Sequence, residues 1–205
     1  MIRPPRRMAV ISAMCLSLML TFGAAAPVGA ATVIKVLYVP QTYQQQTNWC
    51  WAASNQAVIR YIHGGVVFQQ CDQANAAGGL TQCCDYPSRS NCNVGRYNAD
   101  VVRIDRARGY SATEYSGVLS FGSVTSYINA GRPFIVAEQG QAAPGGASYG
   151  HDVVVYGYDY VSGTNGTGDQ WLYVMDPARG LQTWSYADLK KDPYSSQVWN
   201  GGVVY

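Results

Sequence analysis

The uneven distribution of the cysteines constrains this chain more than any other sequence feature. Five of the six cysteines lie beyond residue 31, and four of these fall within 22 residues: Cys71, Cys83, Cys84 and Cys92. Cys50 stands alone, 21 residues upstream of this group. In an oxidising compartment, an odd count leaves one thiol unpaired or forces a bridge to another chain. The economical arrangement is two disulfides within 71–92 and a free Cys50.

Two disulfide connectivities remain open in the 71–92 segment. A bridge between the neighbours Cys83 and Cys84 would be strained, so each must pair with Cys71 or Cys92. A zinc site built from the same four cysteines is the competing interpretation. The adjacent pair is a poor spacing for tetrahedral coordination, and an export signal favours disulfides. We therefore expect no metal and no cofactor.

The first 31 residues are typical of a secretory signal peptide. Arg3, Arg6 and Arg7 precede an uncharged apolar run over 8–26, and small residues at 28–31 offer a cleavage site. A transmembrane helix is the alternative for this run, and no later segment reaches a membrane-spanning length. The leader predicts a secreted protein, either extracellular or periplasmic, without a membrane contact after cleavage.

The remaining 174 residues (205 minus 31) suit a single domain over 32–205, with the cysteine-rich segment at 71–92 as a disulfide-stapled insertion. Removing three arginines changes the formal net charge from +2 to −1. Such a low charge indicates neither nucleic acid nor an anionic membrane as a partner. We expect a monomer.

Apolar periodicity predicts helices first and strands second. The predicted helices are 51–62, 72–77, 97–108 and 124–130, the last with Ser123 as its N-cap. The predicted β segments are 33–39, 134–138, 153–156, 171–175, 184–189 and 198–205. A loop is expected over 139–149 and a turn at Asn165-Gly166. This order predicts an α+β fold with a groove between its two halves.

Cys50 lies between Trp49 and Trp51 at the start of the predicted helix 51–62. Backbone N–H groups without helical partners and the positive end of the helix dipole favour a thiolate there. A buried structural cysteine is the alternative for this residue type. The odd cysteine count favours the reactive thiol.

A nucleophilic cysteine needs a base, and the chain has only two histidines. His63 follows Cys50 on the same predicted helix, about 20 Å away at 1.5 Å per residue. His151 remains, at the head of a strand in the other half of the protein. From that position, its imidazole can face a helix start across the groove. A histidine satisfied within the sheet edge is the alternative.

The imidazole also needs an orienting acceptor. Asp152 is adjacent to His151, but successive strand side chains point to opposite faces, so we expect it to point away. Asp176 closes the next strand, and antiparallel pairing would place it beside His151. The alternative for Asp176 is an ordinary Asp-Pro turn. An oxyanion donor would come from Gln44, Gln45 or Gln46, among which composition does not choose.

Four motifs, in this order, resemble those of papain-like cysteine peptidases. The bacterial branch with the double-glycine leader peptidases and the plant-pathogen effector peptidases is the most similar. The matching segments are Gln44 with Asn48-Trp49-Cys50-Trp51-Ala52-Ala53, Gly131-Arg132-Pro133, the 150–159 stretch beginning Gly150-His151-Asp152, and Val174-Met175-Asp176-Pro177. The resemblance implies a papain-like fold whose catalytic helix packs on a C-terminal antiparallel sheet.

The resemblance also assigns roles. Cys50 corresponds to the nucleophile, His151 to the general base and acid, and Asp176 to the residue that orients the imidazole. Gln44 lies six residues before Cys50, the spacing of the family's oxyanion glutamine. Papain has asparagine at the position of Asp176. The short distance from leader to Gln44 leaves no room for a papain-type propeptide, so a separate inhibitor protein or redox state would restrain activity.

These residues predict a secreted cysteine endopeptidase that hydrolyses peptide bonds of protein or peptide substrates through a thioester. Two alternatives keep the triad and change the reaction: amide hydrolysis in peptidoglycan, and acyl transfer. A third alternative is a non-enzymatic binding or toxin module stabilised by disulfides.

Overall fold

The computed structural model of the protein describes residues 31–65, 68–141, 148–162, 169–189 and 198–205. Residues 1–30 of the predicted leader and the predicted turn at Asn165-Gly166 lie outside the described residues. Within the described ranges, no helix combines the length and the apolar character needed to cross a bilayer.

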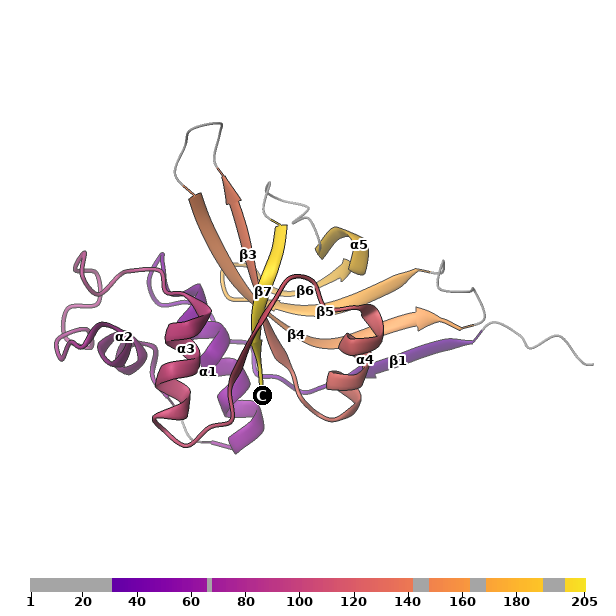
Figure 1. The fold of residues 1–205 in the computed structure, drawn as a ribbon, viewed down its shortest axis with the longest axis horizontal. Helices are drawn as coiled ribbons and strands as arrows, with labels where there is room; N and C mark the ends of the chain where they lie inside the picture. Colours follow the sequence, from indigo (N-terminus) through magenta and orange to yellow (C-terminus); the bar gives the residue numbers. More distant parts are fainter. Residues whose placement is uncertain (1–30, 66–67, 142–147, 163–168, 190–197) are drawn as a thin grey trace, which may run out of the picture.

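Three helices gather on one side of the molecule and a sheet fills the other (Figure 1). The helices are α1 (Cys50–His63), α2 (Gln70–Gly78) and α3 (Asn98–Arg106), close to the predicted ranges. α1 ends where its sequence supplies a glycine. Gly64 adopts a left-handed φ of 57°, and its N–H donates to the Arg60 carbonyl.

Among the described residues, the sheet has seven strands in the order β2-β7-β3-β4-β5-β6, with β1 also paired to β4. Its strands are β1 (Thr32–Val36), β2 (Thr113–Ser116), β3 (Phe134–Gln141), β4 (Ser148–Val161), β5 (Gln170–Asp176), β6 (Gly180–Ser185) and β7 (Val198–Val204). All pairings are antiparallel. The predicted α+β class and antiparallel sheet are therefore correct.

The structure corrects several element boundaries. β3 and β4 extend into the predicted loop 139–149, because polar side chains do not prevent backbone pairing in a hairpin. The predicted β segment 184–189 ends at Ser185, whose hydroxyl accepts the N–H of Asp188 at 3.0 Å and starts the short helix α5 (Tyr186–Leu189). β2 was not predicted, because its four residues are mostly exposed and carry no apolar alternation.

Ser123 is not the N-cap of the fourth helix. α4 (Phe121–Asn129) begins three residues before the predicted start, and Ser120 caps it. The Ser120 hydroxyl accepts the N–H of Ser123 at 3.1 Å. Ser120 and Ser123 lie one helical turn apart, and either serine fits the sequence preference for an N-cap. Ser120, the earlier of the two, accepts an N–H group at the start of the helix.

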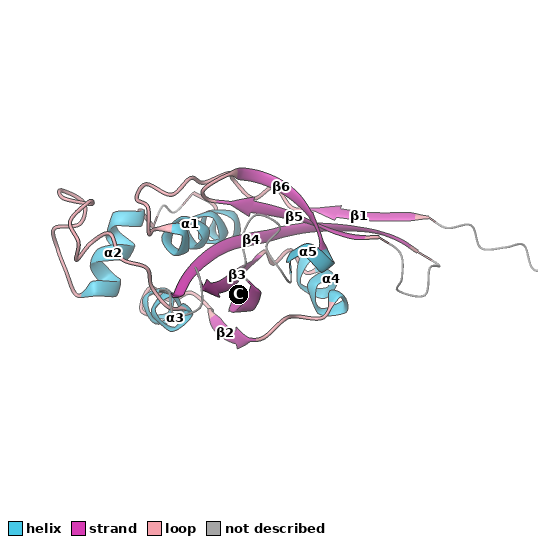
Figure 2. Ribbon diagram, turned by 90° about the horizontal axis from the view of Figure 1, so that it is seen from above, coloured by secondary structure: helices cyan, strands magenta, loops and turns pink. Residues whose placement is uncertain are grey.

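α1 is buried all round, unlike a surface helix. Nine consecutive residues, 51–59, are buried, because α1 lies between the other two helices and strand β4 (Figure 2). Small side chains at Ala53, Ser54 and Ala57 allow the close approach. The Ser54 hydroxyl donates to the Asp152 carbonyl at 2.9 Å. This hydrogen bond attaches α1 to β4 at the residue that follows His151.

A buried polar network joins the three helices to the end of the chain. The Asn55 amide donates to Gln73 Oε1 at 3.1 Å and to Asp105 Oδ1 at 2.9 Å. The Tyr205 hydroxyl lies 2.7 Å from Asn55 Oδ1 and 3.1 Å from Asp105 Oδ2. Burial raises the pKa of Asp105 to about 6, although the hydrogen bonds from Asn55 and Tyr205 oppose the rise.

The Tyr205→Phe substitution is expected to lower the free energy of unfolding by about 1–3 kcal/mol, because it leaves two fully buried acceptors without this donor. Urea unfolding at neutral pH measures the change. Tyr38→Phe is the matched control, because Tyr38 is 96% exposed and its loss should stay within about 0.5 kcal/mol. Equal effects of the two substitutions would show that the network is not stabilising.

Candidate active site

Cys50 is the free cysteine among the described residues, and it is partly exposed. The other four form the disulfides Cys71–Cys84 and Cys83–Cys92, one of the two predicted connectivities. Cys50 is also the first residue of α1, so the helix provides no partner for its backbone N–H. A thiol and an available backbone donor therefore share one residue.

The two tryptophans around Cys50 hold the disulfide-stapled segment against the helix start. The Trp49 indole donates to the Cys92 carbonyl at 2.8 Å, and the Trp51 indole donates to the Val94 carbonyl at 3.1 Å. Each tryptophan is only 1% exposed. The disulfide-stapled segment 71–92 is thus built into the surroundings of the thiol, a link that sequence reasoning did not find.

His151 and Asp176 come together through the pairing of β4 with β5. The register places Val154 opposite Met175, so the start of β4 lies beside the end of β5. His151 Nε2 is 3.0 Å from Asp176 Oδ1, and the Cys50 side chain interacts with the same ring and raises its pKa. The three side chains form one series, with the imidazole in the middle.

Asp176 also organises the turn that follows β5. Its Oδ1 accepts the backbone N–H groups of Ala178 at 2.7 Å and Arg179 at 3.2 Å, and its Oδ2 pairs with the Arg179 guanidinium at 2.9 Å. The side chain is fully buried. Asp176 therefore both starts the Asp-Pro turn and contacts His151, so the two interpretations of this residue do not compete.

The series favours a charged imidazole. Burial lowers the pKa of His151, but the hydrogen bonds and charges of Asp176 and Cys50 outweigh it and raise the pKa to about 10. Burial also disfavours the charged form of Asp176 and so raises its pKa. His151, the Ala178 N–H and Arg179 outweigh this effect and together hold the pKa of Asp176 below its ordinary value of 3.8. The arrangement therefore supports an imidazolium beside the Asp176 carboxylate at neutral pH.

Gln44 uses its amide to shape the turn before α1. Its Nε2 donates to the Gln46 carbonyl at 3.0 Å and to the Thr47 carbonyl at 2.9 Å. Its Oε1 is buried, and no described residue donates a hydrogen bond to it. Gln45 forms a different contact from Gln44, because its backbone N–H donates to Gln70 Oε1 at 2.9 Å.

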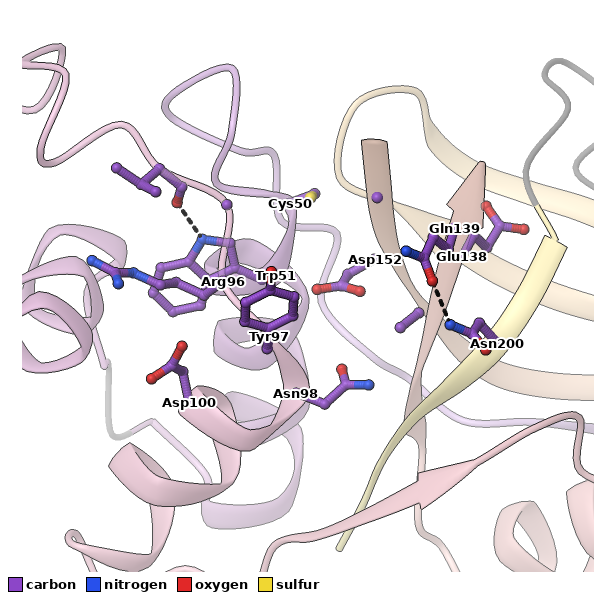
Figure 3. Close-up of a pocket in the computed structure, with 14 residues that line it drawn as sticks. Cys50, Trp51, Arg96, Tyr97, Asn98, Asp100, Glu138, Gln139, Asp152 and Asn200 are labelled. Atoms are coloured by element: carbon purple, nitrogen blue, oxygen red, sulfur yellow. Dashed lines mark hydrogen bonds between the residues drawn. The ribbon is translucent and has the colours of Figure 1, made fainter. Parts of the chain in front are cut away.

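A cavity of about 550 Å³ opens beside Cys50, between the helical half and the sheet (Figure 3). One wall comes from the start of α1 and from 94–98 with Asp100; the other comes from β3, β4 and β7. The lining residues are Cys50, Trp51, Val94, Gly95, Arg96, Tyr97, Asn98, Asp100, Ala137, Glu138, Gln139, Gly150, Asp152 and Asn200.

Asp152 points away from His151, as strand alternation predicts, but it points into this cavity. Gly150 and Asp152 both line the cavity while His151 between them does not, which is the alternation of β4. Sequence reasoning excluded Asp152 as the orienting acceptor and assigned no other role to it. A carboxylate at the head of an apolar strand was the signal that could have singled it out.

Within the described ranges, one group of His, Cys, Asp or Glu side chains is close enough to share a metal ion: Cys71, Asp72 and Cys84. The two sulfurs in this group are bonded to each other. The group lies in the segment 71–92, where the disulfide accounts for both cysteines.

A free cysteine at a helix start, facing a histidine–aspartate pair on an antiparallel sheet, defines the papain-like cysteine peptidases. The family model described as the Peptidase_C39 like family matches residues 35–202, and the chain belongs to this family of cysteine peptidases. The fold is similar to the crystal structure of a protein assigned as a C39-like peptidase from Bacillus anthracis. That similarity has a TM-score of 0.52 at 15% identity and covers 83% of this chain and 96% of the other. No curated protein matches this sequence.

The Asp176→Asn substitution is expected to lower the pKa of His151 from about 10 by about 1 to 3 pH units, because it removes a negative charge from the imidazolium. Asparagine keeps an oxygen for the turn N–H groups. The folded-state pKa lies above 6.5, so the stability that the charged His151 contributes is complete below pH 6.5 and is lost as pH rises through about 10. Proton NMR titration follows His151 directly, and His63 provides an internal reference.

Asp159→Asn is the matched control for this experiment. Asp159 lies on β4, the strand that carries His151, and accepts the Tyr173 hydroxyl at 3.1 Å, away from His151. The Asp159→Asn substitution should leave the His151 titration unchanged. An unchanged titration in Asp176→Asn as well would mean that Asp176 does not hold the imidazole charge.

Proposed function

We propose that the protein is a secreted cysteine endopeptidase that hydrolyses peptide bonds with Cys50, His151 and Asp176. The observation that carries this proposal is the series of interacting side chains from Cys50 through His151 to Asp176, placed beside an open cavity. Export is supported by the predicted leader and by the two disulfides, which persist in oxidising compartments.

The reaction begins with the Cys50 thiolate and the His151 imidazolium. The thiolate attacks the carbonyl carbon of the substrate, a C–S bond forms, and the carbonyl oxygen takes up the negative charge. When the tetrahedral intermediate collapses, the C–N bond breaks and His151 gives its proton to the leaving amine. The acyl half of the substrate remains on Cys50 as a thioester, and His151 is neutral.

Water then completes the hydrolysis. Neutral His151 accepts a proton from water as the oxygen attacks the thioester carbon, and a second oxyanion forms. Its collapse breaks the C–S bond, releases the carboxylic acid product and restores the thiolate–imidazolium pair. Asp176 keeps the imidazole oriented throughout and stabilises its charged form. No redox partner or additional reactant is required.

The oxyanion is stabilised by the Cys50 backbone N–H and, in this proposal, by Gln44. The N–H at the helix start has no helical partner. The Gln44 amide donates to two carbonyls of its own turn, so one of these hydrogen bonds must be exchanged for the oxyanion when substrate binds. The buried Oε1 without a donor makes the present position of this amide easier to leave.

Cys50→Ala and His151→Ala are each expected to reduce casein cleavage by about three orders of magnitude or more, because each removes a group that the chemistry requires. His63→Ala is the matched control and should keep activity, since His63 stacks on Tyr110 at the far end of α1. Release of new peptide N-termini measures the activity. Cleavage of purified cell wall in place of casein would favour the peptidoglycan alternative, and full activity of Cys50→Ala would refute the thiol mechanism.

Gln44→Ala is expected to lower kcat by about 10²- to 10³-fold with a smaller change in KM, because the lost donor acts on a charge that develops in the transition state. Gln46→Ala tests the specificity of this effect and should change kcat little, since Gln46 contributes its backbone carbonyl to the turn. Circular dichroism checks that the turn variants remain folded. Similar kcat values for the two variants would assign Gln44 to the turn alone.

A further inference from the structure

The cavity beside Cys50 contains a carboxyl group without a partner. Asp152 is 7% exposed, and its side chain faces the open space between Tyr97 and Gln139 (Figure 3). No described residue donates a hydrogen bond to its carboxylate, although its backbone carbonyl accepts from Ser54. Burial of a carboxylate without a donor is strongly unfavourable, and it raises the pKa of Asp152 to about 7 while the His151 charge lowers it. A cation or a strong hydrogen-bond donor would match this carboxylate.

Other charged side chains of the cavity wall do not neutralise Asp152. Asp100 is itself an acid and is paired with Arg103 at 2.8 Å. Arg96 does not neutralise Asp152 either, because its guanidinium turns towards α2, with Nη2 2.8 Å from where a Cβ on Gly78 would lie. Figure 3 shows the Arg96 guanidinium directed away from Asp152.

A bulge in β7 lies at the sheet wall of the cavity. The register between β3 and β7 shifts between Ala137 and Glu138, because Asn200 is an extra residue of β7 without a partner on β3. Residues 137–139 of β3 line the same wall. Asn200 donates to Gln139 Oε1 at 2.7 Å, so these two amides are already paired.

We propose that this cavity binds a cationic side chain of the substrate, a lysine ammonium or an arginine guanidinium, with Asp152 as its anchor. Cys50 is part of the cavity wall, so the cation belongs to a residue within about two positions of the scissile bond at roughly 3.4 Å per extended residue. Tyr97, which is 83% exposed, and Val94 offer apolar surface to the methylene groups of such a side chain. The inference rests on the proposed peptidase function and names its substrate preference.

Matched peptides test the preference. N-acetylated, internally quenched peptides differ at one position near the scissile bond, which carries lysine, norleucine or glutamate. The wild-type protein should show kcat/KM for lysine about 10- to 100-fold above that for norleucine, and the glutamate peptide should be the poorest. Asp152→Asn keeps the side-chain size and should bring the lysine-to-norleucine ratio close to one. Because the lysine-to-norleucine ratio compares two peptides on the same protein, any general effect of the Asp152→Asn substitution on His151 cancels.

Asp100→Asn is the control, because it removes a carboxylate of the same cavity that Arg103 already neutralises. It should keep the wild-type ratio. A wild-type ratio near one, or a ratio that survives in Asp152→Asn, would overturn the proposal. Free-amine versions of the peptides form a further arm, and a preference confined to free N-termini would overturn the side-chain assignment.

Binding to the Cys50→Ala protein separates this proposal from the peptidase chemistry. Fluorescence anisotropy with labelled lysine and norleucine peptides reads the cavity without any bond cleavage. Tighter binding of the lysine peptide, lost in the Cys50→Ala, Asp152→Asn double variant, supports the cation site even if no peptide is cleaved by the wild type. Equal binding of the two peptides overturns the site, whereas absent cleavage with selective binding counts against the peptidase function alone.

Discussion

The contact between α1 and β4 is the constraint on which the site depends. Ser54 lies one turn after Cys50, so the two side chains share a face of the helix, and the Ser54 hydroxyl is bonded to the backbone of Asp152. That bond directs the face carrying the thiol towards the start of β4, where His151 lies. Because small residues separate α1 from the sheet, the helix has little freedom to shift. The distance between thiol and imidazole is therefore set by the packing of a buried helix.

Strand β4 serves both sides of the site. His151 points to the thiol and to Asp176, while Gly150 and Asp152 on the opposite face line the cavity. Under the proposed function and substrate preference, two residues that are adjacent in sequence divide between chemistry and substrate recognition. Their charges are coupled, since the His151 charge lowers the pKa that burial raises at Asp152. A cation bound in the cavity would in turn act on the imidazolium, so substrate binding and proton transfer share one electrostatic environment.

The two tryptophans attach the disulfide-stapled segment 71–92 to the site. Sequence reasoning identified the cysteine-rich loop and the tryptophans separately, and nothing in their spacing connects them. In the structure, the indoles of Trp49 and Trp51 hold the carbonyls of Cys92 and Val94, and the segment 94–98 that follows the stapled loop forms part of the cavity wall. The Cys83–Cys92 disulfide fixes the segment that reaches this wall. Such contacts join residues more than 40 positions apart, beyond the reach of local patterns.

Local physical chemistry allowed the sequence alone to determine much of this protein. Helix periodicity and a glycine stop located α1, cysteine parity left Cys50 unpaired, and the scarcity of histidine selected His151. The choice between two disulfide connectivities, the cap at Ser120, the short strand β2 and the direction of Asp152 into a cavity were decided only by tertiary structure. The reason is that each of these depends on what packs opposite the residue. A sequence records a residue's own preferences, and only the folded chain supplies its partners.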